Sequence, residues 1–282
     1  MVFKNRLLKG ENALTKEINL TPRELQYIAA LSDATELLGV SDAFFGMEDE
    51  EILQEAQKLQ ISLETKGYAE MDFDGGFTLK DEARETVDIC ANCDVFIVAD
   101  KNKAEEPQHR EQYYIKDGRI IRIIEKGGVY LLTAMSSTDE MLENIIGDIE
   151  WMPEDASPLQ SIHIKSKVLS DVKSKPDIFD QAGGVSGLIA SGCNEPSAKA
   201  IAAGLSRKAH YYSVVAIVCE GAQNGVYSAM LIDTDSGIYK LTPVINDGEE
   251  LVRFDPLTIS GAKSVMADVI LSVFPRISEG FE

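Results

Sequence analysis

The chain has 282 residues, about twice the size of a common domain, so two domains or one large duplicated domain are expected. Apolar residues make up 44% of it and charged residues 26%, which is ordinary globular composition and excludes low-complexity disorder and fibrous architecture. Asp and Glu number 47 against 27 Lys and Arg, a net charge of -20. A surface this acidic repels nucleic acid and anionic lipid.

The N-terminal sequence, MVFKNRLLKGENALTKE, carries charges every few residues and no apolar stretch, so we expect no signal peptide. The apolar segment 262–274 is interrupted by Lys263 and Asp268 and is too short to cross a bilayer. Four cysteines are too few for a disulfide framework in a chain of this length. We therefore expect a cytoplasmic protein without a membrane partner.

The first predicted elements are two helices. Thr21 is a suitable N-cap, Pro22 fits the first helical position, and Glu24 can complete a capping box. The acidic run 48–51 suits the positive end of a second helix, because negative charge is favourable there. Lys66 and Gly67 predict the end of that helix.

A small hairpin and a third helix follow. Residues 68–73 lead into Asp74-Gly75-Gly76, a turn sequence, and Phe77 begins the return strand. Thr78 with Asp81 is expected to open the next helix. Helix, hairpin, helix is typical of a winged-helix-like unit. The third helix, 79–93, carries more acidic than basic side chains, which argues against DNA recognition.

A β meander completes the first half. Asp117-Gly118 and Gly127-Gly128 are tight-turn pairs. The strands predicted around them are 94–100, 112–116, 119–125 and 129–133, with a polar loop at 101–110. Ser137 is expected to cap a closing helix, and 151–158, with two prolines, is expected to be a linker.

The second half repeats this order of elements. Helices are predicted at 165–172, at 177–190 and after Asn194, and a last helix is predicted from Ser260 until Pro275. The predicted strands are 211–220, 226–234, 238–244 and 251–254. We therefore predict an α+β fold with two halves of one plan, 1–152 and 153–282, whose antiparallel sheets join edge to edge.

The residue types that usually carry chemistry are few and scattered. Cys90 and Cys93 form a single CxxC at the end of a predicted helix, whereas zinc needs four ligands and a redox CxxC needs a helix N-terminus. We interpret them as structural thiols. His109, His163 and His210 have no motif partners. The sequence predicts a protein that is not an enzyme and holds no metal or cofactor.

The order of elements over residues 18–274 resembles that of the EspG-type chaperones of type VII (ESX) secretion. The stretches that carry the likeness are 20–25 (LTPREL), 63–68 (LETKGY), 75–79 (GGFTL), 94–97 (DVFI), 231–239 (LIDTDSGIY) and 254–258 (FDPLT). The resemblance implies a central antiparallel sheet flanked by two helical bundles, with a quasi-two-fold relation between the halves.

The resemblance also implies a function without catalysis or cofactor: binding helical secretion substrates in the cytoplasm and keeping them soluble for export. Mycobacterial members bind paired PE–PPE proteins, and helical WXG- or LXG-like proteins are equally compatible with this chain. By position, the family's cargo contacts map onto the 101–110 loop and the last helix. The residues concerned are Lys103, Glu105, Gln108, His109, Val265, Met266, Val269, Ile270 and Val273.

One alternative is kept beside the chaperone hypothesis. An immunity or antitoxin-like protein that neutralises a basic toxin domain would also be acidic and would also lack a catalytic set. The sequence leaves open which of these two protein-binding functions applies, which surface binds, and how many copies of the chain assemble.

Overall fold

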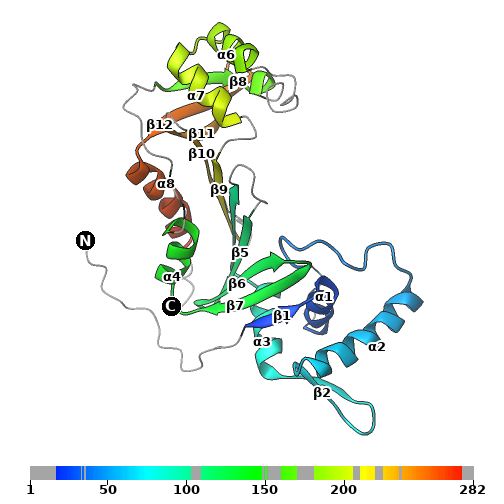
Figure 1. The fold of residues 1–282 in the computed structure, drawn as a ribbon. Helices are drawn as coiled ribbons and strands as arrows, with labels where there is room; N and C mark the ends of the chain where they lie inside the picture. The colour runs from blue at the N-terminus through cyan, green and yellow to red at the C-terminus, as the bar shows by residue number, and fades with distance from the viewer. Residues whose placement is uncertain are drawn as a thin grey trace.

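The computed structural model describes residues 17–102 except 33 and 35, 109–151 except 148 and 150, 160–169, 181–205, 210–219, 225–234 and 237–274. Across these ranges runs one ten-stranded sheet in which every pair of neighbours is antiparallel (Figure 1). The expected α+β fold with an antiparallel sheet is confirmed. No helix in the described part of the chain is long and apolar enough to span a bilayer.

The elements of the first half follow the predicted order. The helices are α1 (Pro22–Leu31), α2 (Asp49–Thr65), α3 (Asp81–Ala91) and α4 (Thr138–Leu142), which continues as a π-helix (Glu143–Gly147). The strands of the large sheet are β1 (Ile18–Leu20), β4 (Val95–Asn102), β5 (His109–Lys116), β6 (Arg119–Lys126) and β7 (Val129–Met135). A separate hairpin consists of β2 (Ala69–Met71) and β3 (Phe77–Leu79).

The second half begins with the strand β8 (Ile162–Lys165). Its helices are α6 (Gln181–Ala190), α7 (Glu195–Leu205) and α8 (Ile259–Leu271). Its other strands are β9 (His210–Val218), β10 (Val226–Thr234), β11 (Gly237–Asn246) and β12 (Glu249–Leu257).

The two halves meet at the middle of the sheet, where β4 pairs with β9. From this pair outward, the order is β4-β5-β6-β7-β1 on one side and β9-β10-β11-β12-β8 on the other. On each side, four strands consecutive in sequence are followed by the first strand of that half. We call the β4–β9 pair the central seam.

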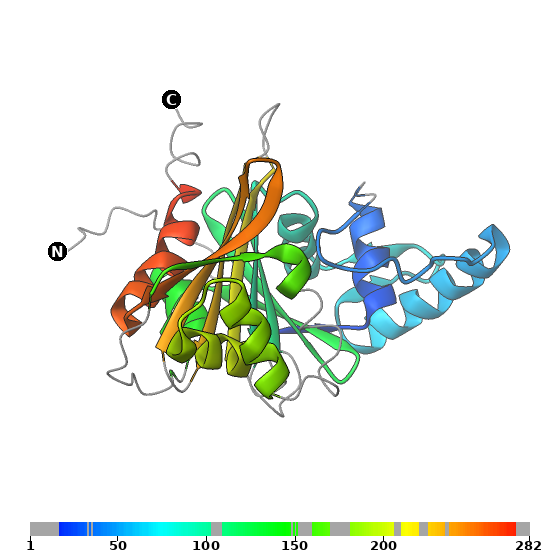
Figure 2. The same cartoon turned by 90° about the horizontal axis from the view of Figure 1, so that it is seen from above.

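Helices cover the two faces of the sheet differently (Figures 1 and 2). On one face, α4, the π-helix and α8 pack over a single apolar cluster to which both halves contribute, with Ile97 and Tyr113 from one half and Val214 and Leu231 from the other. On the opposite face there are two clusters. One lies beneath α1 and α3 over the first half, and the other lies beneath α6 and α7 over the second half.

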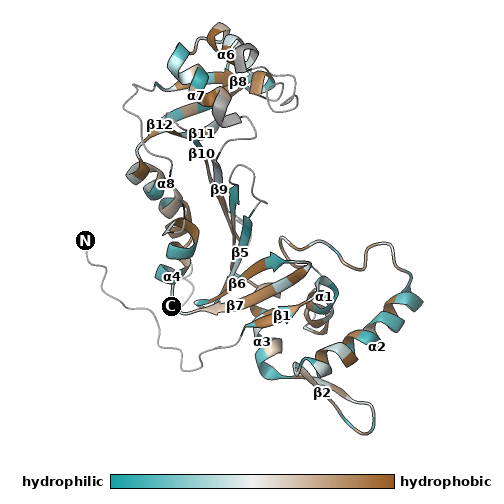
Figure 3. Cartoon of the chain, in the orientation of Figure 1, coloured by the Kyte–Doolittle hydropathy of each residue, from teal (hydrophilic) through white to brown (hydrophobic). Residues whose placement is uncertain are grey.

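The helix α2 and the β2–β3 hairpin extend away from the sheet (Figure 1). Only Leu59 and Leu63, near its C-terminal end, are buried among the residues of α2. The outer end of this helix is strongly hydrophilic (Figure 3), as the acidic residues of its first turn require. The predicted winged-helix-like order of helix, hairpin and helix is present here.

Several predicted boundaries are confirmed by their hydrogen bonds. The Glu24 amide donates to Thr21 Oγ1 at 3.2 Å, and the Thr21 amide donates to Glu24 Oε2 at 2.7 Å, which completes the predicted capping box. The turn between β5 and β6 has positive φ at both Asp117 (50°) and Gly118 (74°), as a tight hairpin turn demands.

Other sequence predictions were wrong in detail. Thr78 lies in β3, and Lys80 is the residue before α3. The cap of α8 is Thr258, whose hydroxyl accepts from the Gly261 amide at 3.1 Å, so the helix begins before Ser260. It ends at Leu271, before the predicted stop.

The region predicted as helix from 165 to 172 instead contains the strand β8, followed by one helical turn at 166–169. Neither β8 nor β1, the two edge strands of the sheet, was predicted. Most of the predicted linker at 151–158 lies outside the described residues.

Candidate interaction site

The helix α8 divides its predicted partner-binding residues between the core and the surface. Met266 and Ile270 lie on the stripe of α8 that faces β9 and β10, and they are fully buried in the cluster beneath it, as is Val273, two residues beyond the helix. A partner cannot touch them unless α8 leaves the sheet. Val265 and Val269 lie on the neighbouring stripe and are half-buried, so they are the two members of this set that reach a surface.

A groove of about 420 Å³ lies where Val265 and Val269 approach the start of β10. The other residues that line it are Val226, Tyr227, Ser228, Lys240, Asp268 and Ser272. The ladder between β10 and β11 begins only at Met230, opposite Leu241. The first residues of β10 therefore pair with β9 on one side and border the groove on the other. This edge of β10 lies beside apolar side chains of α8.

The second predicted set follows β4. Lys103, Glu105 and Gln108 lie outside the described residues. His109 is the first residue of β5 and is exposed. Its Nε2 lies 2.7 Å from Glu111 Oε1, so the only described member of this set belongs to a polar cluster.

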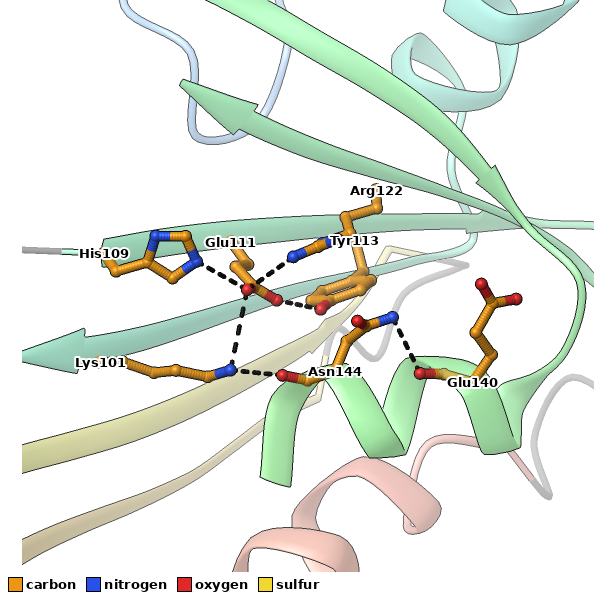
Figure 4. Close-up of polar contacts among 7 residues, drawn as sticks. All are labelled: Lys101, His109, Glu111, Tyr113, Arg122, Glu140 and Asn144. Atoms are coloured by element: carbon orange, nitrogen blue, oxygen red, sulfur yellow. Dashed lines mark hydrogen bonds and ion pairs between the residues drawn. The ribbon is translucent and has the colours of Figure 1, made fainter. Parts of the chain in front are cut away.

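That cluster is centred on Glu111, whose side chain is only 1% exposed (Figure 4). Arg122 Nη2 donates to Glu111 Oε1 at 2.8 Å, and Lys101 Nζ lies 3.7 Å from the same atom. The Tyr113 hydroxyl donates to Oε2. Burial alone would raise the pKa of Glu111, but these three groups hold it below the ordinary value for a glutamate.

The Glu111 cluster is built to hold elements together. Lys101 also donates to the main-chain carbonyl of Asn144, so it links β4 to the π-helix (Figure 4). Both carboxylate oxygens of Glu111 already accept hydrogen bonds, so Glu111 is poorly placed to accept a proton as a general base. Among the described residues there is no group of three or more His, Cys, Asp or Glu side chains arranged to hold a metal.

The opposite face of the central seam carries an apolar surface that the sequence analysis missed. Side chains alternate along each strand, and the register places Val98 opposite Val215, Ile217 opposite Val226, and Met230 opposite Leu241 on one face. We call these six residues the bare strip. The first two pairs meet at β9, and the third continues onto β11.

The bare strip lies between the two clusters of this face. Val98 and Ile217 border the cluster beneath α1 and α3, and Leu241 borders the cluster beneath α6 and α7. Val215, Val226 and Met230 belong to none of the three clusters formed by the described residues. Val226 is 65% exposed and Met230 is 38% exposed.

The groove and the bare strip share residues at the start of β10. Val226 belongs to both, and Ser228, opposite Val215 in the register, also lines the groove. At one end of the strip, Ser213 pairs with both Met230 and Asp100, and Asp100 accepts two hydrogen bonds from Arg110, at 2.7 and 3.2 Å. The arrangement is an apolar surface with polar groups at one end, features that are typical of protein-binding surfaces.

The comparison with solved structures agrees with this architecture. The chain is similar to the Mycobacterium tuberculosis type VII secretion system chaperone EspG5, whose structure was solved in complex with a PE25–PPE41 dimer, with a TM-score of 0.59. The match covers 90% of this chain and 96% of that chain. The chain has the EspG fold. Sequence identity is 12%, and no protein-family model and no curated protein matches the sequence.

The sequence predicts the architecture but not the bare strip, and the side chains of β10 show why. In β10, apolar side chains occur on both faces, since Leu231 is buried on one and Met230 is exposed on the other. No local pattern distinguishes the covered face from the uncovered one. That difference depends on where α1, α3, α6 and α7 lie in three dimensions.

Proposed function

We propose that this chain is a non-enzymatic cytoplasmic chaperone or adaptor that binds helical type VII secretion substrates and keeps them soluble for export. The observation that carries the proposal is the bare strip, a partly exposed apolar surface at the middle of a sheet whose fold is shared with a secretion chaperone. An exposed apolar surface with polar margins is typical of a protein-binding site.

The physical properties of the chain support this role. A helical substrate exposes its apolar face or tip to water until a partner covers it. A sheet face with an adjoining groove can provide that cover. The net charge of -20 keeps the chain soluble while its own apolar surface is open. We expect the substrate to contact Val226 and Met230 directly, with Val265 and Val269 extending the contact into the groove.

We also infer that the two halves, 1–152 and 153–282, repeat one plan and that the chain is a member of the EspG family. The matching strand orders on the two sides of the seam support this. So does the equivalent position of α4 and α8, each of which follows its four-stranded meander and packs on the same face.

The substrate class follows from the same likeness. EspG5 was solved with a PE25–PPE41 dimer, so paired PE/PPE-like proteins are one candidate, and WXG- or LXG-like helical proteins are the others. The loop residues Lys103, Glu105 and Gln108, together with His109, remain proposed contacts at the edge of the binding surface.

The test combines binding with secretion. Helical secreted proteins from the native cell are purified and titrated against the wild-type chain and against a Val226→Asp, Met230→Asp double variant. We expect binding by the wild type, at least a tenfold weaker affinity for the variant, and loss of export of the bound substrate in a deletion strain. Normal export and no helical partner would refute the proposal. Rescue from a co-expressed toxin, with export unchanged, would support the immunity alternative instead.

A further inference from the structure

Three of the four cysteines come together at one end of the central seam. Cys90 lies in the last turn of α3, and Cys93 precedes β4 by two residues. Cys219 directly follows β9. Cys90 and Cys93 are part of the apolar cluster beneath α3, and Cys219 packs against it. The CxxC that we interpreted as a pair of structural thiols therefore has a third thiol beside it, contributed by the other half of the chain.

The backbone brings Cys93 and Cys219 within reach of each other. The Cys219 amide donates to the Asp94 carbonyl at 2.8 Å, which continues the register that pairs Val95 with Val218. Cys93 directly precedes Asp94, and the side chains of Cys93 and Cys219 pack in the same apolar cluster, so the two thiols are neighbours.

The two thiols differ in accessibility and in acidity. Cys219 is half-buried, whereas Cys93 and Cys90 are buried. The neighbouring Cys93 thiol lowers the pKa of Cys219, whereas the neighbouring Cys219 and burial raise the pKa of Cys93. Burial raises the pKa of Cys90 as well. A partly exposed thiol with a lowered pKa, beside a buried thiol, is the arrangement found at redox-sensitive cysteine pairs.

We propose that Cys219 and Cys93 are a peroxide-sensitive pair that closes to a disulfide across the central seam. The Cys219 thiolate attacks one oxygen of hydrogen peroxide, the O–O bond breaks, and hydroxide leaves, so that Cys219 becomes a sulfenic acid. The Cys93 thiol then attacks the Cys219 sulfur, the S–S bond forms, and the hydroxyl leaves as water. In sum, two thiols and one peroxide give one disulfide and two waters.

This oxidation site lies next to the bare strip but does not depend on it. Cys219 is two residues beyond Ile217 in the strip, and the new bond would tie the segment before β4 to the end of β9. The disulfide would thus add a covalent cross-link at the central seam, where strand pairing and packing join the described residues of the two halves.

The test is peptide mapping of the purified full chain after brief exposure to hydrogen peroxide and alkylation of the remaining thiols. Cleavage after Lys and Arg places Cys90 and Cys93 on one peptide, 85–101, and Cys219 on another, 209–240. We expect these peptides to be linked without reductant and separate with it. Fragment ions assign the bond to Cys93 rather than Cys90.

Variants make the order of events measurable. Cys219→Ser should abolish the link, and Cys193→Ser, a buried thiol outside the group, should retain it. In Cys93→Ser, Cys219 should remain a sulfenic acid and react with dimedone. A link between Cys90 and Cys93, alkylation of all four thiols after peroxide in the wild type, or no dimedone adduct in Cys93→Ser would overturn the proposal.

Discussion

Replacing Glu111 by glutamine tests the polar cluster that joins β4, β5 and β6. The substitution keeps the size of the side chain but removes the negative charge that faces Lys101 and Arg122. These two side chains are only 10% and 21% exposed, so solvent compensates them poorly. Breaking a buried ion pair from one side costs about 3–5 kcal/mol. We expect about 3 kcal/mol of lost unfolding free energy, because glutamine still accepts hydrogen bonds.

The loss of stability caused by Glu111→Gln should also depend on pH, in a direction that the pKa of Glu111 determines. Because the pKa of Glu111 is lower in the folded chain than its ordinary value of 4.5, the stabilisation is fully present above that value. It is lost as the pH falls through the lower, folded-state pKa. Glutamine does not titrate, so the difference between wild type and Glu111→Gln should shrink on acidification below about pH 4.

The assay is urea unfolding followed by circular dichroism, at pH 7 and at successively lower pH. Glu85→Gln is the matched control, since Glu85 pairs with Arg119 at 3.4 Å and both side chains are about half exposed. An exposed pair contributes roughly 0–1 kcal/mol, so this control should unfold nearly as the wild type does. A Glu111→Gln chain within about 1 kcal/mol of wild type, or a loss that does not shrink in acid, would refute the reasoning.

Four further substitutions test the surface, the core and a helix cap. Met230→Asp should weaken substrate binding at least tenfold and change stability by less than about 1 kcal/mol, measured by titration and urea unfolding. Leu53→Asp, at an exposed position on α2, should change neither quantity. Met266→Ala should lose about 2–5 kcal/mol, because it empties space beneath α8, whereas binding by the remaining folded chain should persist. Thr21→Ala should lose about 1 kcal/mol in thermal unfolding, through loss of the cap of α1.

The sequence predicts the interior strands well because their signals are local. Asp117-Gly118 and Gly127-Gly128 specify tight turns, and the three glycines of these pairs all have positive φ. The strands on either side are seven or eight residues long, long enough for a pattern to be recognised. The order of the meander therefore follows from short-range chemistry.

The edge strands and the candidate site do not follow from local signals. The strands β1 and β8 have three and four residues, too few to show a period, and each exists only because a distant strand, β7 or β12, pairs with it. Likewise, the approach of Cys219 to Cys93 depends on the seam register. Contacts between the halves decide these features, and no window of sequence contains both partners.

The arrangement of the helices gives a physical reason for the position of the bare strip. On the face of α8 and α4, one cluster extends across the seam, so both halves are buried together. On the other face, each half covers its own outer strands, with α1 and α3 at one end and α6 and α7 at the other (Figure 1). Val215, on the seam strand β9, and Val226 and Met230, on the adjoining β10, therefore lie between the two covered regions. An apolar surface produced in this way can contact a partner without loss of core packing, since the cluster on the opposite face and the pairing of β4 with β9 join the halves independently of it.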